Sequence, residues 1–322
     1  MKLSNFFKYT VIILINYFVV FFFVYILSGF LLIKGITPNL KLITEYQRNF
    51  YIHGGIRNIW QSHKECVDFD EETIFIPKST ACKFKNLEFD TNIKFDEKGR
   101  YSNHPVSDKK GIAVIGDSHA MGWGVNDNET FSYILEKKIN RPVFNLAVSG
   151  YGTIRELIRL EKSKVLSQID TVIIQYCYND SGENNFFQKN SYDEARKKFD
   201  LMVNGAPVSN YKKFRRAIRY SATIPIDIIT KKNKSLNFDP HKDLLIKTIK
   251  KFPNLSSKKI LVFYTNGYDI KFFNFPNEKS KEITNLEFID LKLKDKHFFK
   301  IDGHLKGNGH KFIAEKLSKV FL

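Results

Sequence analysis

Residues 112–118, with the sequence IAVIGDS, decide the fold of this 322-residue chain. A short run of β-branched and apolar residues that ends at a glycine is typical of a buried strand that stops abruptly. In open α/β sheets, functional side chains collect beyond the carboxyl ends of the strands. We therefore expect Ser118 to lie on an exposed turn after a central strand, with backbone N–H groups close by.

Strand and helix patterns alternate from about residue 109 onward. In the expected helices, apolar residues recur at spacings of three and four, which places them on one face. The alternation predicts an α/β fold in which helices cover both faces of a parallel sheet. We expect strands at 112–115, 143–148, 171–177, 260–264 and 286–291, and helices at 130–139, 153–166 and 309–322.

The same patterns predict the domain organisation. Within the α/β domain, residues 181–258 are too many for a simple connection between two strands, so we interpret them as an insertion with its own helices. The whole chain then consists of a short N-terminal flank (1–9), an apolar anchor (10–33), an irregular juxtamembrane cap or stalk (34–108) and the α/β domain (109–322).

The apolar stretch at 10–33 is long enough to cross a membrane as a helix. About 20 apolar residues span the hydrocarbon core of a bilayer, and only Asn16 and the pair Ser28-Gly29 interrupt this run. A cleaved signal peptide has a shorter apolar region, so we favour an uncleaved anchor. A cleaved signal and a buried helix are the alternatives. Basic residues flank both ends, and the positive-inside rule therefore fixes no orientation.

The three cysteines bear on the compartment. Cys66 and Cys82 are close enough in sequence to close a small loop, whereas Cys177 ends a strand pattern and is expected to be a buried thiol. A disulfide between Cys66 and Cys82 would require an oxidising compartment, and two reduced surface thiols are the alternative. We favour a single-pass membrane protein whose domain faces the periplasm or another extracytoplasmic space.

The chain is strongly basic, with a net charge of +17 from 51 basic and 34 acidic residues. We interpret most of this charge as a solvated, lysine-rich surface, and attraction to an anionic membrane or polymer is the alternative. The basic segment 211–220 is interpreted in the same two ways, as a surface helix or as an interfacial helix. No zinc spacing or RNA-binding motif supports nucleic acid as a partner.

Polar residues suited to chemistry occur at four boundaries between the expected elements. They are Gly116-Asp117-Ser118 after the first strand, the segment 145–150 (NLAVSG) at the second, Tyr178-Asn179-Asp180 after the third, and Asp302-Gly303-His304 before the last helix. This constellation resembles the SGNH hydrolases, also called GDSL-type esterases, over roughly residues 109–322. The name-giving residues fall on Ser118, Gly150, Asn179 and His304. The resemblance implies a three-layer, flavodoxin-like parallel sheet and an acyl-serine intermediate.

The chemistry of these residue types gives each a role. A serine becomes a strong nucleophile only when a neighbouring base accepts its proton, so Ser118 needs His304. Asp302 would hold the imidazole in the required tautomer, and Gly303 between them permits a loop. The oxyanion needs preorganised donors, for which we assign the backbone N–H groups of Ser118 and Gly150 and the side-chain amide of Asn179.

The spacing of the acid and the base departs from the family pattern. Many members have Asp-x-x-His, whereas this chain has Asp302-x-His304, a spacing that resembles some envelope polysaccharide O-acetyltransferases of the same superfamily. No group of His, Cys, Asp and Glu has metal-ligand spacing, and no phosphate-binding loop is present. We therefore expect no metal and no cofactor.

Three functions are compatible with these residues. The leading hypothesis is a membrane-anchored serine esterase that removes an O-acyl group, with O-acetyl favoured, from a cell-envelope glycan or lipid. The second is an envelope polysaccharide O-acyltransferase that uses the same Ser118, His304 and Asp302. The third is an anchored binding or assembly protein without turnover, against which the intact set of catalytic residue types counts.

Overall fold

The computed structural model describes residues 3–187, 193–194, 197, 200–201, 209–230, 234–265, 270–272 and 274–322. Its contacts divide the chain into two units. Unit 1 comprises Met1–Asn58, Pro207–Lys232 and Lys300–Asp302, and unit 2 comprises Ile59–Ala206, Asn233–Phe299 and Gly303–Leu322.

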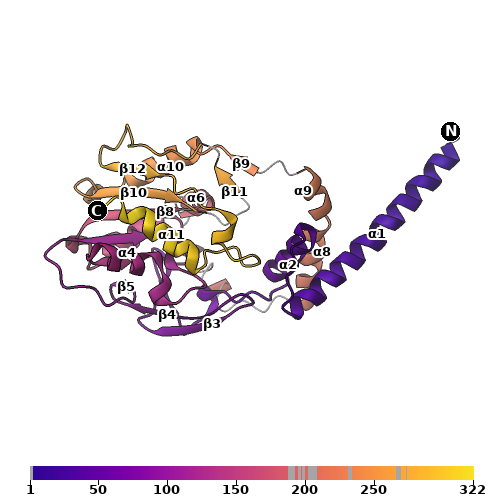
Figure 1. The fold of residues 1–322 in the computed structure, drawn as a ribbon, viewed down its shortest axis with the longest axis horizontal. Coiled ribbons are helices and arrows are strands. Elements are labelled where there is room, and N and C mark those ends of the chain that lie inside the picture. Colours follow the sequence, from indigo (N-terminus) through magenta and orange to yellow (C-terminus); the bar gives the residue numbers. More distant parts are fainter. Residues whose placement is uncertain are drawn as a thin grey trace. The chain divides into compact units, whose positions relative to one another are not determined.

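Unit 2 is built around an eight-stranded sheet with the order β12-β10-β8-β6-β7-β5-β4-β3 (Figure 1). Its parallel part confirms the predicted sheet, and β6 lies between β7 and β8. Numbered along the chain, the five parallel strands have the order 2-1-3-4-5, which is the flavodoxin-like order. They are β6 (Gly111–Ile115), β7 (Val143–Asn145), β8 (Ile169–Tyr176), β10 (Lys259–Tyr264) and β12 (Leu286–Ile289).

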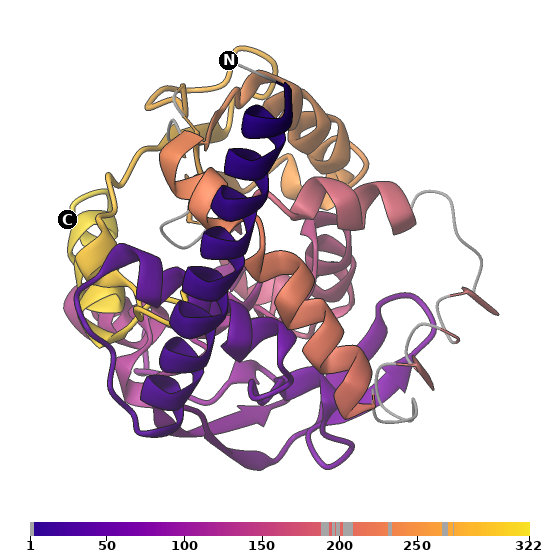
Figure 2. The same cartoon turned by 90° about the vertical axis from the view of Figure 1, so that its right-hand side faces the viewer.

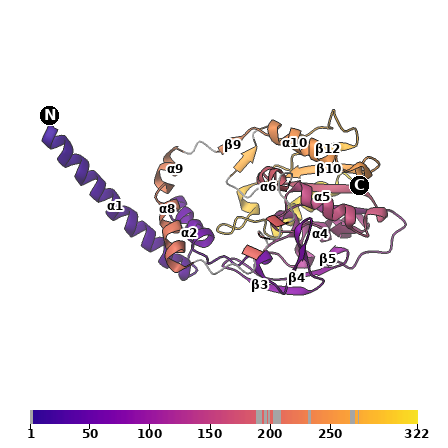
Figure 3. The same cartoon turned by 180° about the vertical axis from the view of Figure 1, so that it is seen from behind.

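Helices cover both faces of this sheet, as the alternation of strands and helices predicts. Helices α4 (Phe131–Ile139) and α11 (Gly307–Ser318) lie in front of the sheet in Figure 1, and α5 (Thr153–Lys162) lies in front of it in the reverse view of Figure 3. The strand residues divide accordingly. Ile112 and Val114 pack in the core with α4 and α11, whereas Ala113 and Ile115 pack with α5 and α10 (Asp239–Ile249). This is the expected three-layer architecture.

The segment between the apolar stretch and β6 is not irregular, contrary to our expectation for 34–108. Strand β4 (Asp90–Asp96) alternates strictly, with Thr91, Ile93 and Phe95 buried, which is the period of a half-buried antiparallel strand. It pairs with β3 (Ala81–Lys85) and β5 (Gly99–Arg100), and β5 pairs antiparallel with β7. These strands therefore extend the main sheet, and a separate hairpin is formed by β1 (Val67–Asp70) and β2 (Ile74–Pro77).

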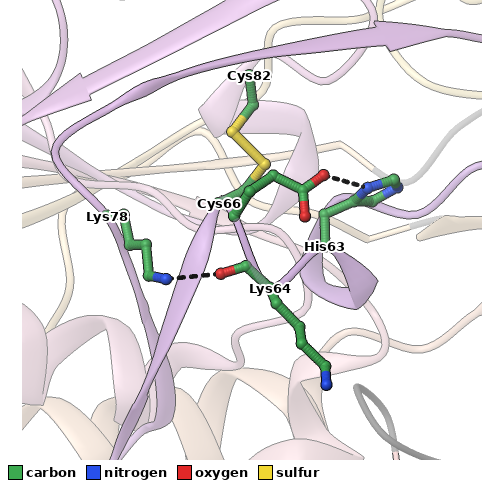
Figure 4. The surroundings of a disulfide bond; sticks show 6 residues. His63, Lys64, Cys66, Lys78 and Cys82 are labelled. Carbon is green, nitrogen blue, oxygen red and sulfur yellow. Dashed lines mark hydrogen bonds and ion pairs between the residues drawn. A yellow bond between two sulfur atoms is a disulfide. The ribbon is translucent and has the colours of Figure 1, made fainter.

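A disulfide bond joins Cys66 to Cys82, with 6.1 Å between the Cα atoms (Figure 4). Cys66 immediately precedes β1 and Cys82 lies on β3, so the bond ties the hairpin to the extension of the main sheet. Both cysteines are buried in the same core as Trp60 and Phe84. A backbone bond from Lys78 N–H to the Cys66 carbonyl, 2.9 Å long, closes the same loop.

The disulfide should be a measurable source of stability. The bond closes a loop with a sequence separation of 16, for which loop-closure entropy predicts about 3 kcal/mol. Urea unfolding of unit 2 should therefore shift to a lower midpoint when a reductant is added. A Cys66→Ser, Cys82→Ser double variant is the control, because its midpoint should be low and insensitive to reductant. A wild type whose midpoint ignores the reductant would contradict the bond.

Unit 1 is helical. It contains α1 (Leu3–Ile33), α2 (Lys41–His53), α8 (Asn210–Ser221) and α9 (Ile224–Thr230). Among the described residues, one helix is long and apolar enough to cross a membrane, over Phe6–Ile33 with a mean hydropathy of 2.6. Figure 2 shows the orange helices α8 and α9 beside the indigo helix α1. The rings of Phe214 on α8 and Tyr25 on α1 form an edge-to-face pair with 6.4 Å between their centroids.

The region 181–258, expected to be one insertion, contributes to both units. Helix α6 (Asp180–Phe187) and helix α10 belong to unit 2, whereas α8 and α9 belong to unit 1. In α8, Ala217 and Ser221 are buried and the arginines are exposed, which is the pattern of a surface helix. A small parallel pair of strands, β9 (Lys234–Leu236) and β11 (Ile270–Phe272), completes unit 2. Short 3₁₀ helices occur at Trp60–Ser62, Asp127–Glu129, Leu166–Gln168, Pro253–Leu255 and Asp295–His297.

Candidate active site

The turn that carries Ser118 begins where β6 ends. At Gly116 a Cβ atom would lie 2.6 Å from the Cβ of Ala120 and 2.7 Å from Gln175 Oε1, so only glycine fits this close approach. The Asp117 carboxylate accepts a 2.8 Å hydrogen bond from the His119 N–H and caps the short helix α3 (Ser118–Met121). Ser118 is therefore the first residue of a helical turn at the carboxyl edge of the sheet.

Gln175 on the neighbouring strand β8 holds this turn in place. Its Oε1 accepts hydrogen bonds from the backbone N–H groups of Asp117 at 3.1 Å and of Ala120 at 3.2 Å. The Gln175 side chain is fully buried. Our sequence analysis did not single out Gln175, because a glutamine inside an apolar strand gives no signal of which backbone groups it will meet.

Ser118 and His304 are in direct contact. The distance from Ser118 Oγ to His304 Nε2 is 2.7 Å, a hydrogen bond in which the hydroxyl donates when Nε2 carries no proton. His304 lies in a turn closed by two backbone bonds, from Phe299 N–H to the His304 carbonyl and from Gly303 N–H to the Phe299 carbonyl. Gly303 has a φ of +83°, which explains why a glycine separates Asp302 from His304.

Gly150 lies in the loop after β7, the strand next to β6. The Val148 N–H donates to the Gly116 carbonyl at 3.0 Å, and the Ser149 N–H lies 3.3 Å from Met121 Sδ. These contacts hold the loop against the turn that carries Ser118. Gly150 itself has a φ of +81°, a conformation that side-chain-bearing residues rarely adopt.

Asn179 lies in the loop after β8, the strand on the other side of β6. Its side chain is exposed, and its carbonyl accepts backbone bonds from Gly182 and Glu183 at the start of α6. The buried neighbour Asp180 fixes the loop, because its Oδ2 accepts from the Cys177 N–H and the Thr153 hydroxyl, each at 3.1 Å. The residues assigned to the oxyanion hole thus come from the three adjacent strands β7, β6 and β8.

Asp302 belongs to unit 1, whereas the next two residues, Gly303 and His304, belong to unit 2. Within unit 1, the Tyr51 hydroxyl donates a 2.8 Å hydrogen bond to Asp302 Oδ2, and Arg57 Nε lies 3.4 Å from the same oxygen. The Asp302 side chain is almost completely buried. Its action on His304 remains a prediction.

Two further residues close to the predicted site residues were missed by the sequence analysis. The ring of His119 lies 4.8 Å from that of His304, between centroids, with 34° between the planes. Gln61 was missed because it is distant in sequence, and its Oε1 accepts a 3.2 Å hydrogen bond from the Ser149 hydroxyl beside Gly150. His310 is buried on α11, and its Nδ1 accepts a 3.1 Å hydrogen bond from the Phe131 N–H.

Three carboxyl groups are buried in this part of unit 2: Asp117, Glu156 and Asp180. Burial raises the pKa of each, and for Glu156 and Asp180 the rise is large. The neighbouring carboxylates add to it, because Asp180 raises the pKa of Glu156 and Asp117 raises the pKa of Asp180. Within the described ranges, no group of three or more His, Cys, Asp or Glu residues is arranged to hold a metal ion.

The fold and the site define a class: an α/β protein of flavodoxin-like strand order with a serine–histidine pair at the carboxyl edge of its sheet. No protein-family profile and no curated protein matches the chain. Solved structures do match. A lipolytic protein of the G-D-S-L family from Desulfitobacterium hafniense is 12% identical, over 66% of this chain and 99% of that protein, with a TM-score of 0.33.

Two other proteins with similar structures are named as ester-cleaving enzymes. A lipase/acylhydrolase from Enterococcus faecalis is 15% identical, over 66% of this chain and 94% of that protein, with a TM-score of 0.36. A family two carbohydrate esterase from Clostridium thermocellum, solved in complex with cellohexaose, is 11% identical, over 68% of this chain and 65% of that protein, with a TM-score of 0.33.

The raised pKa of Glu156 makes stability depend on pH. Folded Glu156 retains a proton that the unfolded chain releases above the usual glutamate pKa of 4.5. The free energy of unfolding therefore falls as pH rises from that value toward the pKa of the folded state. Glu156→Gln stays neutral at every pH, so we expect it to raise the thermal midpoint over wild type at about pH 8, by ~2–4 °C per kcal/mol gained, with little difference at about pH 4.

The matched control is Glu161→Gln on the exposed side of the same helix, α5. Its midpoint should follow that of the wild type at both pH values, as measured by differential scanning fluorimetry. If Glu156→Gln gains nothing between the acidic and the alkaline condition, the buried glutamate is ionised in the folded protein and the assignment is wrong.

Proposed function

We propose that this protein is a membrane-anchored serine esterase of the SGNH type, which removes an O-acyl group, with O-acetyl favoured, from a glycan or lipid of the cell envelope. The observation that carries the proposal is the 2.7 Å contact between Ser118 Oγ and His304 Nε2. A serine hydroxyl becomes a competent nucleophile when an imidazole accepts its proton, and this distance is within hydrogen-bond reach.

The reaction follows from these two groups. Ser118 Oγ attacks the acyl carbon while His304 Nε2 takes the hydroxyl proton, and a tetrahedral oxyanion forms. The bond between the acyl carbon and the alcohol oxygen then breaks, and His304 returns its proton to the leaving alcohol. Water attacks the acyl-serine with His304 again as the base, which releases the carboxylic acid and restores the Ser118 hydroxyl.

The negative charge of the intermediate requires donors that are already in place. We assign the backbone N–H groups of Ser118 and Gly150 and the side-chain amide of Asn179. The positions of these residues support the assignment, because all three follow the carboxyl ends of adjacent strands. Asp302 completes the mechanism as the residue that orients the imidazole and stabilises it when protonated.

The membrane part of the proposal is supported by α1 and by the disulfide. Most side chains in the first two thirds of α1 are exposed, including Phe18, Val19 and Val20. An apolar helix of this length with an exposed surface is matched to a bilayer. The Cys66–Cys82 disulfide favours an oxidising, extracytoplasmic location for unit 2.

Transfer to a glycan hydroxyl uses the same acyl-serine, with an alcohol in place of water. The short spacing Asp302-x-His304 supports this alternative, because it resembles the spacing in some envelope polysaccharide O-acetyltransferases. Product analysis separates the two reactions: free carboxylate from an acetylated envelope glycan indicates hydrolysis, and acyl transfer to an added acceptor glycan indicates a transferase.

Ser118→Ala tests the nucleophile. In the full chain purified in detergent, this variant should lose hydrolysis of a small acetyl ester by at least about a thousandfold and should not be labelled by a fluorophosphonate probe. Ser181→Ala is the control, because this half-buried serine on α6 donates to the Tyr178 carbonyl and has no role in the proposed mechanism. A wild type that neither hydrolyses nor labels would favour the binding or assembly role, and an active Ser118→Ala would refute the assignment.

Asn179→Asp tests the oxyanion hole. The substitution replaces an N–H donor by a carboxylate at nearly the same size, so kcat should fall by about a hundred- to a thousandfold while KM changes little. Asn92→Asp, an exposed position on β4, controls for the added charge. Steady-state kinetics with the acetyl ester make the comparison, and an unchanged kcat would remove Asn179 from the mechanism.

A further inference from the structure

A short segment of unit 1, Lys300–Asp302, ends two positions before His304. It is held by other residues of unit 1. Arg48 Nε donates to the Lys300 carbonyl at 2.7 Å, and Lys300 Nζ donates to the Pro38 carbonyl at 2.7 Å. Ile301 is buried in a small apolar cluster with Leu32 and Tyr51. The backbone and side chains of this short segment are therefore fixed by the end of α1, by α2 and by the loop between them.

The carboxylate of Asp302 is held by a hydroxyl group and a guanidinium group. Its side chain is 1% exposed, the Tyr51 hydroxyl donates to Oδ2 at 2.8 Å, and Arg57 Nε lies 3.4 Å from Oδ2. A buried carboxylate is stable only when hydrogen bonds and an opposite charge compensate the loss of water. Tyr51 is itself fully buried on α2, so its hydroxyl has little freedom to point elsewhere.

We propose that Tyr51 is a positioning residue for catalysis, which fixes the orientation of the Asp302 carboxylate and thereby that of His304. The Tyr51 hydroxyl and Arg57 Nε both contact Oδ2 of this carboxylate. Arg57 assists by supplying the opposite charge. The inference rests on the proposed function, since it gives Tyr51 a role only if Asp302 acts on His304.

This role assigns the helix next to the membrane anchor to the catalytic machinery. Helix α2 follows α1 after a short loop, and its residues Arg48 and Tyr51 both contact the segment Lys300–Asp302. Further contacts of this segment come from Leu32 at the end of α1, from the loop between α1 and α2, and from Arg57 just after α2.

The test is Tyr51→Phe in the full chain in detergent, which removes the hydroxyl and keeps the ring in its apolar cluster. A hydrogen bond to a charged group supports an expected fall of kcat by about ten- to a hundredfold, with KM for the acetyl ester unchanged. The rate of fluorophosphonate labelling of Ser118 should fall by a similar factor. The matched control is Tyr46→Phe, another buried tyrosine of α2, whose ring packs against Phe21 and Tyr25.

A double-mutant cycle with Asp302→Asn separates positioning from a general structural effect. If Tyr51 acts through Asp302, adding Tyr51→Phe to Asp302→Asn should cause little further loss. Effects of the two substitutions that multiply would overturn the inference, as would a Tyr51→Phe enzyme with the same kcat as Tyr46→Phe, while the proposed function would stand. A wild type that neither hydrolyses esters nor labels at Ser118 would overturn the proposed function and this inference with it.

Discussion

The 2.7 Å hydrogen bond between Ser118 and His304 is the interaction on which the proposed chemistry depends. It joins residues 186 positions apart in the chain, so it forms only when the sheet and the last turn before α11 are in place. On the serine side, the abrupt end of β6 at Gly116 and the two bonds from Gln175 fix the nucleophile. On the histidine side, the turn at Gly303 presents the imidazole. Neither side chain has a chemical role in the proposed mechanism without the other.

Burial of charge has a cost around this site. Asp117, Glu156 and Asp180 are enclosed in the sheet and its helices, and desolvation by burial raises the pKa of each. For Glu156 and Asp180, repulsion from neighbouring carboxylates raises the pKa further. Asp117 and Asp180 accept backbone hydrogen bonds that hold the loops carrying Ser118 and Asn179. Such stability costs are common where a fold arranges polar groups for function. The buried carboxylate of Asp302, in unit 1, has a hydroxyl donor and an arginine as compensation.

The parallel sheet was predictable because its strands are short apolar runs bounded by turns, and its helices repeat every three to four residues. The antiparallel extension was missed. In β4 the alternation of Thr91, Ile93 and Phe95 with charged and polar residues is present in the sequence, but a single short alternating run next to cysteines does not reveal which sheet edge it joins. The division of 181–258 between two units was also hidden, because α8 and α10 are both amphipathic and only their partners differ.

The sequence by itself determined the local elements, the apolar helix and the residue types at the strand ends, because periodicity, β-branching and glycine positions act over a few neighbouring residues. Only the tertiary structure decided which of those residues meet. Three contacts join segments that are distant in the sequence: the hydrogen bond between Ser118 and His304, the disulfide between Cys66 and Cys82, and the hydrogen bond from Tyr51 to Asp302. Such contacts depend on how the whole chain packs. The residue types offered the first two pairs as candidates, but no local pattern fixes that their side chains meet.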